Sequence, residues 1–388
     1  MLLPQAAATA AGWALIAARV PQRGFGPVLD PASYTRWDSL DYLDIARRGY
    51  WATWGQNASC TGPLGTGRYL CGDISWFPGY PALVRGMSEL LPIGLARSAL
   101  IVAWVGWLVT FVLLWRLVQL HVPAHRRWLC LAVAAVFPGS IYYAALFPIS
   151  ICLAGLLGCL TIGGSSRESR WMTGAALLCG VLAGTSYPTA VGAVPAFVAA
   201  GLLVRRSDAT RSRRWFAGAA GVLVGFVSIM PIMAVAVGRW NAYFVSERRW
   251  QVGLVLPWTA LWDRLRPLYA HTGQRGGQTA ALQSLLVLVI VGALIASRAR
   301  ALRRRAAAAR PLPAREPAVT AMEVGVAGLW VFPYVVGGTL SVYRSESLLL
   351  IGVPLLGRLP RPALAVLAVL ALGIAWRLDG IYFAGHLE

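Results

Sequence analysis

The residues best suited to chemistry are three aspartates in one short polar segment. Asp38, Asp41 and Asp44 recur at every third position in the stretch from Arg36 to Tyr50. If that stretch is helical, the three carboxylates drift slowly round one side of it. A carboxylate within hydrogen-bond reach of a hydroxyl can serve as a general base. The simpler interpretations are a solvated helix cap at Asp38 and surface ion pairs between the other two aspartates and the arginines that follow them.

The composition is that of a membrane protein with many spans. Of the 388 residues, 57% are hydrophobic and only 13% are charged, and the mean hydropathy is +0.61. A soluble domain needs more polar surface than this, whereas a bundle of membrane helices does not. The formal charge of +20 does not indicate nucleic-acid binding, because the arginines fall in short clusters between apolar runs.

The hydropathy pattern predicts an all-α polytopic bundle that forms a single domain over residues 1–388. About eleven apolar runs are candidate spans, although several are short for a bilayer. They cover residues 6–20, 94–119, 128–146, 148–165, 171–187, 189–204, 215–237, 280–297, 320–340, 346–358 and 362–376. Two long polar segments separate them, at 21–92 and 238–279.

Three apolar stretches are interrupted by proline or charge, at 147–148, 186–188 and 343–346. At membrane depth such interruptions are tolerated where the backbone is buried in protein or lines a wet cavity. An ordinary tight turn at the membrane surface explains the first two equally well.

The arginine distribution predicts the orientation. Alternate loops are rich in arginine, and the segments 205–214 and 298–316 are the most basic. The positive-inside rule places such loops in the cytoplasm. The loops 21–92 and 238–279 then share the extracytoplasmic side with the 343–346 turn. We therefore expect a multi-pass cell-membrane protein whose active site, with Asp38, is extracytoplasmic.

The second large loop mixes tryptophans with arginines, among them Arg248 and Arg249. This mixture suits an interfacial helix at the level of the lipid headgroups. It also suits a cleft for a lipid phosphate, since arginine can grip phosphate through two hydrogen bonds. Both interpretations stay open.

The cysteines predict one disulfide and no metal site. Cys60 and Cys71 share the first loop, and their separation suits a disulfide if that loop faces an oxidising compartment. The other four cysteines lie in apolar runs, as small core residues do. No Cys/His cluster has metal-ligand spacing.

The motifs around Asp38 resemble those of one glycosyltransferase family. The pattern W-D-x-x-x-Y-x-x-I-A-x-x-G-Y fits Trp37–Tyr50, and W-F-P-G-Y-P follows at Trp76–Pro81. A third stretch, within 238–250, matches more weakly. In order and spacing the motifs are similar to those of the second mannosyltransferase of glycosylphosphatidylinositol assembly and its bacterial relatives.

The resemblance implies a GT-C-type inverting glycosyltransferase, specifically a mannosyltransferase. The implied donor is a polyprenyl-phosphate sugar, and the implied acceptor is an extracytoplasmic lipid- or glycan-linked hydroxyl. Asp38 would be the base, with Trp37 and Tyr42 framing the sugar or anchoring the loop. One carboxylate suffices for inversion because no glycosyl-enzyme forms. The resemblance implies neither metal nor cofactor, although Asp41, Asp44 or Asp73 could still hold a divalent ion.

The departing lipid phosphate requires fixed positive charge. Arg344 is the leading candidate, because it is a charge at the membrane edge on the predicted side, near Glu346, which could orient it. Arg248 and Arg249 are further candidates. The remaining predicted substrate-binding residues come from the motifs and are Asp41, Tyr50, Trp76 and Tyr80.

This chain replaces two residues of the family pattern. Ile149 stands where the family has a glutamate, and Tyr187 stands where it has an arginine. These replacements leave the acceptor open. The alternative function is a transporter or flippase of a lipid-linked or anionic solute, which inverted repeats and charges near mid-span would favour. The sequence lacks such symmetry, and its acids cluster in a loop.

Overall fold

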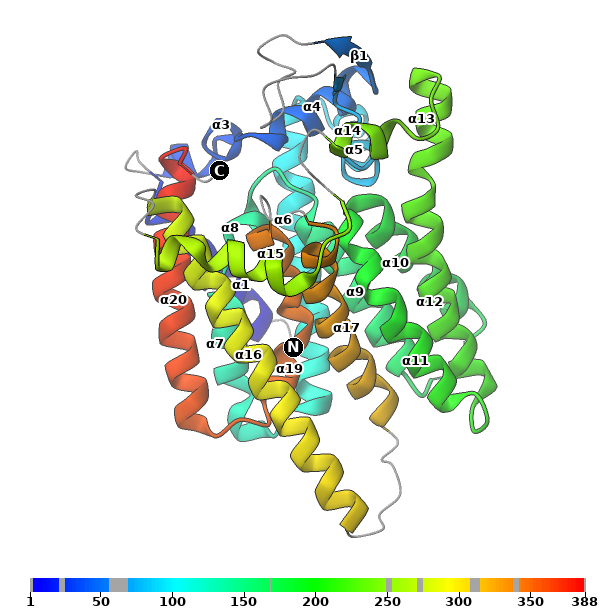
Figure 1. The fold of residues 1–388 in the computed structure, drawn as a ribbon, viewed down its shortest axis with the longest axis vertical. Helices are drawn as coiled ribbons and strands as arrows, with labels where there is room; N and C mark the ends of the chain where they lie inside the picture. The colour runs from blue at the N-terminus through cyan, green and yellow to red at the C-terminus, as the bar shows by residue number, and fades with distance from the viewer. Residues whose placement is uncertain are drawn as a thin grey trace.

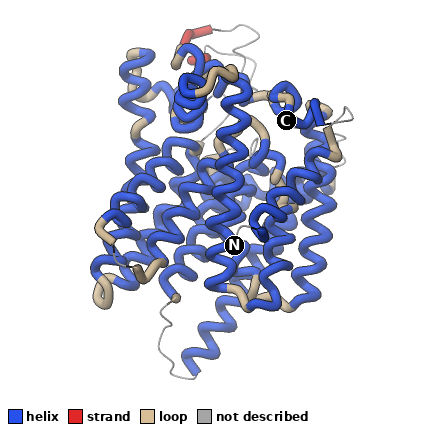
Figure 2. Tube along the Cα trace, turned by 180° about the vertical axis from the view of Figure 1, so that it is seen from behind, coloured by secondary structure: helices blue, strands red, loops and turns tan. Residues whose placement is uncertain are grey.

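The protein is a bundle of helices with a small two-stranded hairpin at one end (Figure 1). The computed structural model describes residues 3–20, 25–55, 69–167, 169–248, 253–270, 275–307, 315–337 and 342–386. Seen from behind, most of the described chain is helical, and the strands lie together at one extremity (Figure 2). We call this extremity the hairpin end.

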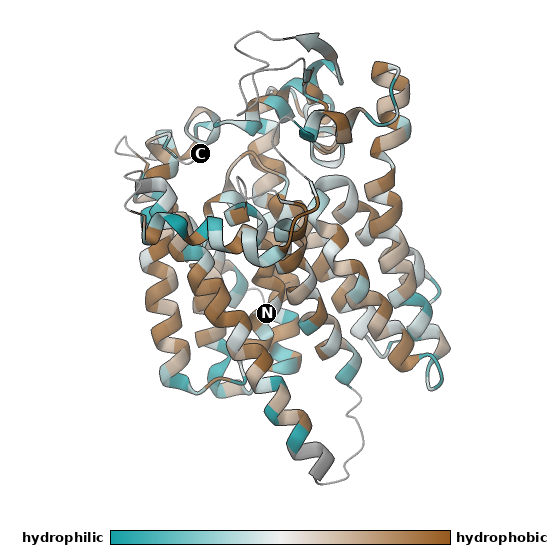
Figure 3. Ribbon diagram, in the orientation of Figure 1, coloured by the Kyte–Doolittle hydropathy of each residue, from teal (hydrophilic) through white to brown (hydrophobic). Residues whose placement is uncertain are grey.

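Five helical segments of the described chain are long and apolar enough to cross a membrane. They are α6 (Leu95–His121), α12 (Ala209–Val227) with α13 (Ile229–Val237), α16 (Arg275–Ala307), α17 (Glu316–Val335) and α20 (Arg361–Phe383). Shorter apolar helices complete the bundle: α1 (Leu3–Ala17), α9 (Ile149–Gly164), α10 (Trp171–Ser186), and η2 (Pro188–Ala193) with α11 (Val194–Val204). Apolar residues dominate the middle of the bundle, and polar ones gather towards its two ends (Figure 3). The prediction of an all-α polytopic membrane protein is confirmed.

The predicted span 128–146 is divided in the structure. After η1 (Ala124–Arg126), the chain forms α7 (Arg127–Ala135) and the short α8 (Ile141–Ala144). Pro138 and Gly139 separate them, and Gly139 has a φ of 82°. Proline lacks an amide hydrogen and glycine accepts this left-handed backbone, so the pair ends the helix.

The predicted span 346–358 is not one helix either. It forms η6 (Ser347–Gly352) and α19 (Val353–Leu356), and every residue of both is buried. Pro354 lies at the second position of α19, where proline starts a helix rather than continuing one. The segment is therefore part of the bundle interior.

The hairpin end is formed mainly by the first polar segment. Its elements are α2 (Phe25–Leu29), α3 (Pro31–Tyr34), α4 (Asp38–Arg48), β1 (Ala52–Gly55), β2 (Tyr69–Gly72) and α5 (Gly79–Leu90). The strands pair antiparallel, with Ala52 opposite Gly72. Cys71 is disulfide-bonded; Cys60, its predicted partner, lies outside the described residues.

The second polar segment forms α14 (Ala242–Glu247), α15 (Pro257–Leu265) and η4 (Arg266–Leu268). α15 lies across the bundle rather than along it (Figure 1). It exposes Trp258 and Trp262 and buries Ala260. This placement is typical of an interfacial helix.

Helices α10 and α12 pack with their backbones in contact. A Cβ on Gly184 would lie 2.2 Å from the carbonyl oxygen of Val222, and one on Gly221 would lie 2.2 Å from that of Leu177. No side chain fits at such distances, so glycine sets the separation of the two helices. Membrane helices associate largely through close packing of this kind, because lipid is as apolar as their side chains.

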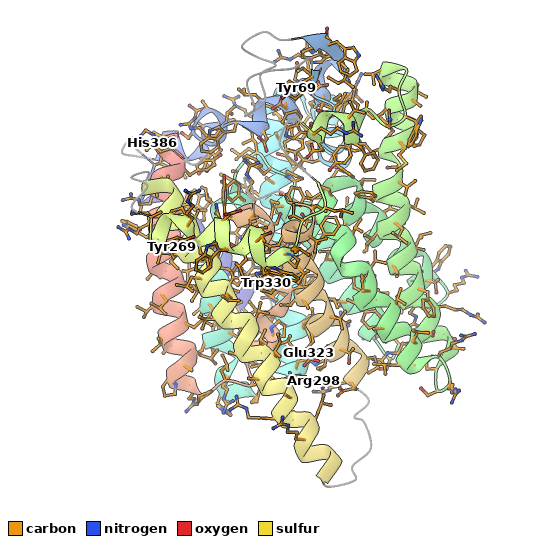
Figure 4. The ribbon with its side chains drawn as sticks, in the orientation of Figure 1. Tyr69, Tyr269, Arg298, Glu323, Trp330 and His386 are labelled. Carbon is orange, nitrogen blue, oxygen red and sulfur yellow. The ribbon has the colours of Figure 1, made fainter. Side chains whose placement is uncertain are left out.

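At the opposite end, charged side chains join three segments. Arg298 of α16 pairs with Glu316 and Glu323 of α17, and its Nε lies 3.1 Å from Glu323 Oε2 (Figure 4). Arg358, just before α20, lies 2.5 Å from the other oxygen of Glu323. Each oxygen of the Glu323 carboxylate therefore pairs with an arginine, and the two ion pairs tie the ends of α16 and α17 to the segment before α20.

Asp73 is a buried carboxylate beside the hairpin. Its Oδ1 accepts a hydrogen bond from the Trp51 N–H at 2.9 Å, and its Oδ2 has no hydrogen-bond partner among the described residues. Burial is the main cause that raises the pKa of Asp73 from 3.8 to about 6. Asp73 therefore binds its proton more tightly in the folded protein than in the unfolded chain.

Replacing Gly184 with valine is expected to lower the free energy of unfolding by about 1–3 kcal/mol, because the new side chain must push α10 away from α12. Gly174→Val is the matched control, since a Cβ there meets no atom within 4 Å. Thermal unfolding in detergent, followed by tryptophan fluorescence, should show a lower midpoint for the Gly184 variant. Equal midpoints for the two variants would contradict the packing argument.

The Asp73→Asn variant is expected to lose part of the pH dependence of stability. Because the folded state holds the Asp73 proton more tightly than the unfolded chain, this group stabilises the fold below about pH 4. That contribution, about 3 kcal/mol in all, is lost as the pH rises through the folded pKa of about 6. Chemical denaturation between these pH values should show a flatter profile for Asp73→Asn, whereas the exposed control Asp263→Asn should keep the wild-type profile.

Candidate active site

Asp38 is the first residue of α4, and the backbone just before it is unusual. Trp37 has a φ of 44°, and within the described ranges it is the one non-glycine residue with positive φ. Such a conformation costs about 1–3 kcal/mol. The Trp37 ring packs edge-on against Tyr382 of α20, with 5.4 Å between ring centres. This contact holds the turn from which the Asp38 side chain projects.

Arg344 of α18 (Val342–Glu346) is paired with Asp38, although 306 positions separate the two residues. The Nη1 of the arginine donates to Oδ2 of the aspartate. The Arg344 side chain is 9% exposed, and that of Asp38 is 28% exposed. The guanidinium is therefore enclosed in the protein, while the carboxylate is still accessible.

Aromatic rings surround the Arg344 guanidinium. Its central carbon lies 5.2 Å from the ring centre of Phe147, 5.7 Å from that of Tyr142 and 5.8 Å from that of Tyr343. Ring faces attract cations at such distances. The Nε of Arg344 is buried and has no hydrogen-bond partner among the described residues. Asp38 is thus the carboxylate partner that makes burial of this charge tolerable.

The three interruptions in the apolar stretches meet at this site. Phe147 precedes the proline that starts α9, and it packs against Arg344. Tyr187, in the break between α10 and η2, brings its hydroxyl 3.4 Å from Ser345 Oγ. Thr189 Oγ1 lies 3.1 Å from the same Ser345 oxygen. The breaks therefore line a polar interior, and they are not surface turns.

Hydrogen bonds from neighbouring helices hold the backbone on both sides of Arg344. Gln283 of α16 donates to the carbonyl of Tyr343 at 2.7 Å, and the Tyr143 hydroxyl donates to that of Ser347 at 2.8 Å. Glu346 accepts a bond from the Tyr334 hydroxyl at 3.0 Å. Among the described residues, Arg344 forms its ion pair with Asp38, whereas the nearby Glu346 bonds to Tyr334.

The other residues of the first two motifs form a floor beneath α4. Tyr42 packs edge-on against Tyr80, at 5.6 Å between ring centres, and is buried. The Tyr80 hydroxyl donates to the carbonyl of Ala99 at 2.9 Å, and that of Tyr50 donates to the carbonyl of Trp76 at 2.8 Å. These contacts make Tyr50, Trp76 and Tyr80 structural supports of the loop; a contact with substrate stays a prediction.

A cavity of about 400 Å³ adjoins the segment that carries Arg344. Its polar wall includes Tyr187, Thr189, Ser345, Glu247 and Arg248, and its apolar wall includes Phe226, Phe244, Leu254, Phe332 and Val336. Neither Asp38 nor Arg344 lines this cavity; its wall reaches the residue next to Arg344, because Ser345 lines it and lies 3.4 Å from the Tyr187 hydroxyl. Of the two arginines predicted in the second loop, Arg248 lines the cavity, and Arg249 lies outside the described residues.

The other two aspartates of α4 are Asp41 and Asp44. Asp44 pairs with Arg48 one turn later, as the simpler interpretation expected. Asp41 is half-buried. Among the residues that the structure describes, no group of three His, Cys, Asp or Glu side chains could hold a metal ion.

Sequence reasoning singled out Tyr343, as part of an interrupted apolar stretch, but missed Tyr142 and Tyr382, which also pack around the site. Tyr142, Tyr343 and Tyr382 pack together, with Tyr142 5.8 Å from Tyr343 and 5.9 Å from Tyr382 between ring centres. The Tyr382 hydroxyl donates to the carbonyl of Tyr34 at 2.7 Å. Tyrosines in an apolar run next to a Pro-Gly break were an available signal for Tyr142, whereas nothing local marks Tyr382.

Comparison with known proteins gives a fold but no close relative. No protein-family profile matches the sequence, and no characterised protein matches it significantly. The oligosaccharyltransferase of Archaeoglobus fulgidus, crystallised with zinc and sulfate, matches at a TM-score of 0.53 with 11% identity. That match covers 97% of this chain and 53% of the archaeal enzyme, so the chain spans about half of that protein's length.

Two further structures match with low identity. The same archaeal enzyme tethered to an acceptor peptide gives a TM-score of 0.53, 12% identity, and coverage of 100% of this chain and 55% of the enzyme. ArnT of Cupriavidus metallidurans, bound to undecaprenyl phosphate, gives 0.40 and 15%, covering 92% of this chain and 77% of ArnT. At such identities the matches with a TM-score of 0.53 show the fold alone: this chain has the GT-C-type membrane-helix fold of the archaeal oligosaccharyltransferase.

Proposed function

We propose that this protein is an inverting glycosyltransferase that moves a sugar from a polyprenyl-phosphate donor to a lipid- or glycan-linked acceptor on the extracytoplasmic side. The observation that supports this most is the pairing of Asp38 with Arg344 beside a cavity with polar and apolar walls. The motif resemblance makes mannose the sugar. The GT-C fold is compatible with this chemistry but does not specify it.

The two charges have the roles that such a transfer requires. Asp38, which remains accessible, takes the proton from the acceptor hydroxyl as its oxygen attacks the anomeric carbon. The bond between that carbon and the phosphate oxygen breaks on the opposite face, and its electron pair stays on the phosphate. Arg344 offsets the charge that develops there. One displacement inverts the anomeric configuration without a glycosyl-enzyme.

The ion pair also accounts for the order of events. With no substrate bound, Arg344 is held by Asp38. An arriving lipid phosphate competes for the guanidinium, because arginine binds phosphate with paired, charge-assisted hydrogen bonds. Phosphate binding thereby weakens the hold on Asp38 and leaves its carboxylate free to act as a base.

The cavity fits a donor of this kind. Its polar wall, with Thr189 and Ser345, suits sugar hydroxyls and phosphate oxygens, and its apolar wall, with Phe226 and Phe332, suits an isoprenoid chain. Arg248 on its rim adds a second positive charge near the lipid phosphate.

The Asp38→Asn variant is expected to transfer sugar at least about 10²-fold more slowly, because asparagine cannot accept the proton. The assay follows labelled mannose from polyprenyl-phosphate mannose into membrane lipid or polymer. The control Asp44→Asn, which breaks only a surface ion pair, should stay close to wild type. Wild-type turnover by Asp38→Asn would contradict the assignment of Asp38 as the general base. If that variant moved the donor across sealed vesicles without transferring any sugar, the result would favour the flippase.

The Arg344→Lys variant keeps the positive charge but loses the planar pair of donors. We expect catalytic efficiency for the donor to fall about 10- to 100-fold, the equivalent of a lost charge-assisted hydrogen bond. Arg239→Lys is the control, because Arg239 stacks on Trp54 at 5.4 Å and lies apart from the ion pair. Equal donor kinetics in the Arg344 and Arg239 variants would contradict the phosphate role.

A further inference from the structure

A larger cavity lies on the other side of α20. Its volume is about 1110 Å³, and it is lined by Arg19 just after α1, by η4, by the start of α16 and by the last turns of α20. His386, which lines the cavity, follows α20 and lies at its upper end in Figure 4. The polar residues of its wall are Arg19, Arg377, His386, Gln278 and Thr279.

This cavity faces away from the Asp38 site. On α20, Tyr382 is buried and contacts Trp37, next to Asp38. Arg377 and Gly380, which line the cavity, lie on the opposite side of the helix by its 3.6-residue period. The two sites therefore share one helix, and each uses a different face of it.

The cavity lies at the top of an exposed apolar stripe. Val366, Val369 and Leu370 of α20 are 58%, 68% and 51% exposed. Arg377 follows Leu370 by seven residues and Val366 by eleven, so it lies on the same face two and three turns further along. A hydrocarbon chain packed along this stripe would end with its headgroup beside Arg377.

Arg19 brings a second positive charge to this place. Its guanidinium stacks on Trp376 at 4.6 Å from the ring centre, and its Nε is buried with no hydrogen-bond partner among the described residues. A Cβ on Gly380 would lie 1.8 Å from Arg19 Nη2, so glycine is what lets the arginine lie across the helix. Asp379 interacts with Arg19 and offsets its charge, although it does not line the cavity. Arg377 contributes a further guanidinium to the lining, so the cavity keeps a positive charge.

We propose that this cavity binds the phosphate headgroup of an anionic membrane lipid, whose chains lie along the stripe of Val366, Val369 and Leu370. Positive charge at headgroup level, above a lipid-facing apolar stripe, matches such a lipid in both of its parts. A tryptophan at the same level is typical of the membrane–water interface. The site is separate from the one proposed for the sugar donor, and it does not depend on the glycosyltransferase activity.

The test measures lipids that stay on the full-length protein. The protein is taken from nanodiscs of phosphatidylcholine and phosphatidylglycerol into the gas phase, and bound lipids are counted by native mass spectrometry. We expect phosphatidylglycerol to be retained over phosphatidylcholine. Each of Arg19→Gln and Arg377→Gln should lower that excess about fivefold, and the double variant about 25-fold.

The matched control is Arg170→Gln, since Arg170 also stacks on a tryptophan, at 5.0 Å from the ring centre of Trp171, between α9 and α10. Its lipid retention should equal that of the wild type. Arg377 is exposed, so its single variant tests the site even if Arg19→Gln folds poorly. Unchanged retention in Arg377→Gln would overturn the proposal.

Excess inorganic phosphate separates a lipid from a soluble anion. We expect it to leave most phosphatidylglycerol in place, because the chains contribute to binding. Complete displacement by phosphate alone would show an anion site that does not recognise lipid, and would also overturn the proposal.

Discussion

The structure depends on one ion pair, between Asp38 at the start of α4 and Arg344 in α18. A guanidinium enclosed by aromatic rings carries a large desolvation cost and persists only with a counter-charge. Phe147, Tyr142 and Tyr343 supply the enclosure, and Asp38 supplies the charge. The pair therefore ties the first polar segment to the last third of the chain. It also leaves the carboxylate, but not the arginine, in contact with solvent.

The interrupted helices follow from the same constraint. An unbroken helix satisfies its own backbone and offers only side chains to a site, whereas a break at membrane depth must be covered by neighbours. Here the break before α9 and the break after α10 both contact α18, through Phe147 on Arg344 and through Tyr187 and Thr189 on Ser345. Tyr187 and Thr189 share Ser345, while Gln283 and Tyr143 hold the carbonyls next to it. The polar groups that the breaks expose thus become the wall of the site.

Helix α20 lies between this site and the proposed lipid site. Its inner face carries Tyr382, which packs against the strained Trp37 and hydrogen-bonds to the Tyr34 carbonyl. Its outer face carries an apolar stripe that ends at Arg377. The proposed sugar-transfer site and the proposed lipid site therefore use opposite sides of one helix. Any shift of α20 would move the turn from which Asp38 projects.

Much of this could be predicted from the sequence, because it depends on local pattern. Apolar runs and their arginine-rich separators indicate a polytopic helical bundle, and the spacing around Asp38 marks α4 and its carboxylate. Arg344 stood out for a similar reason, as a charge inside an apolar stretch. The tertiary structure alone decided that these two residues meet and that Tyr50 and Tyr80 hydrogen-bond within the protein. It alone made Tyr382 the support of Trp37. The ion pair joins positions 306 apart, and the contact of Tyr382 with Trp37 joins the last helix to the first polar segment. Even the hydrogen bonds of Tyr50 and Tyr80 reach 26 and 19 positions along the chain, and a residue's own neighbours in the chain carry no record of what packs against it from beyond them.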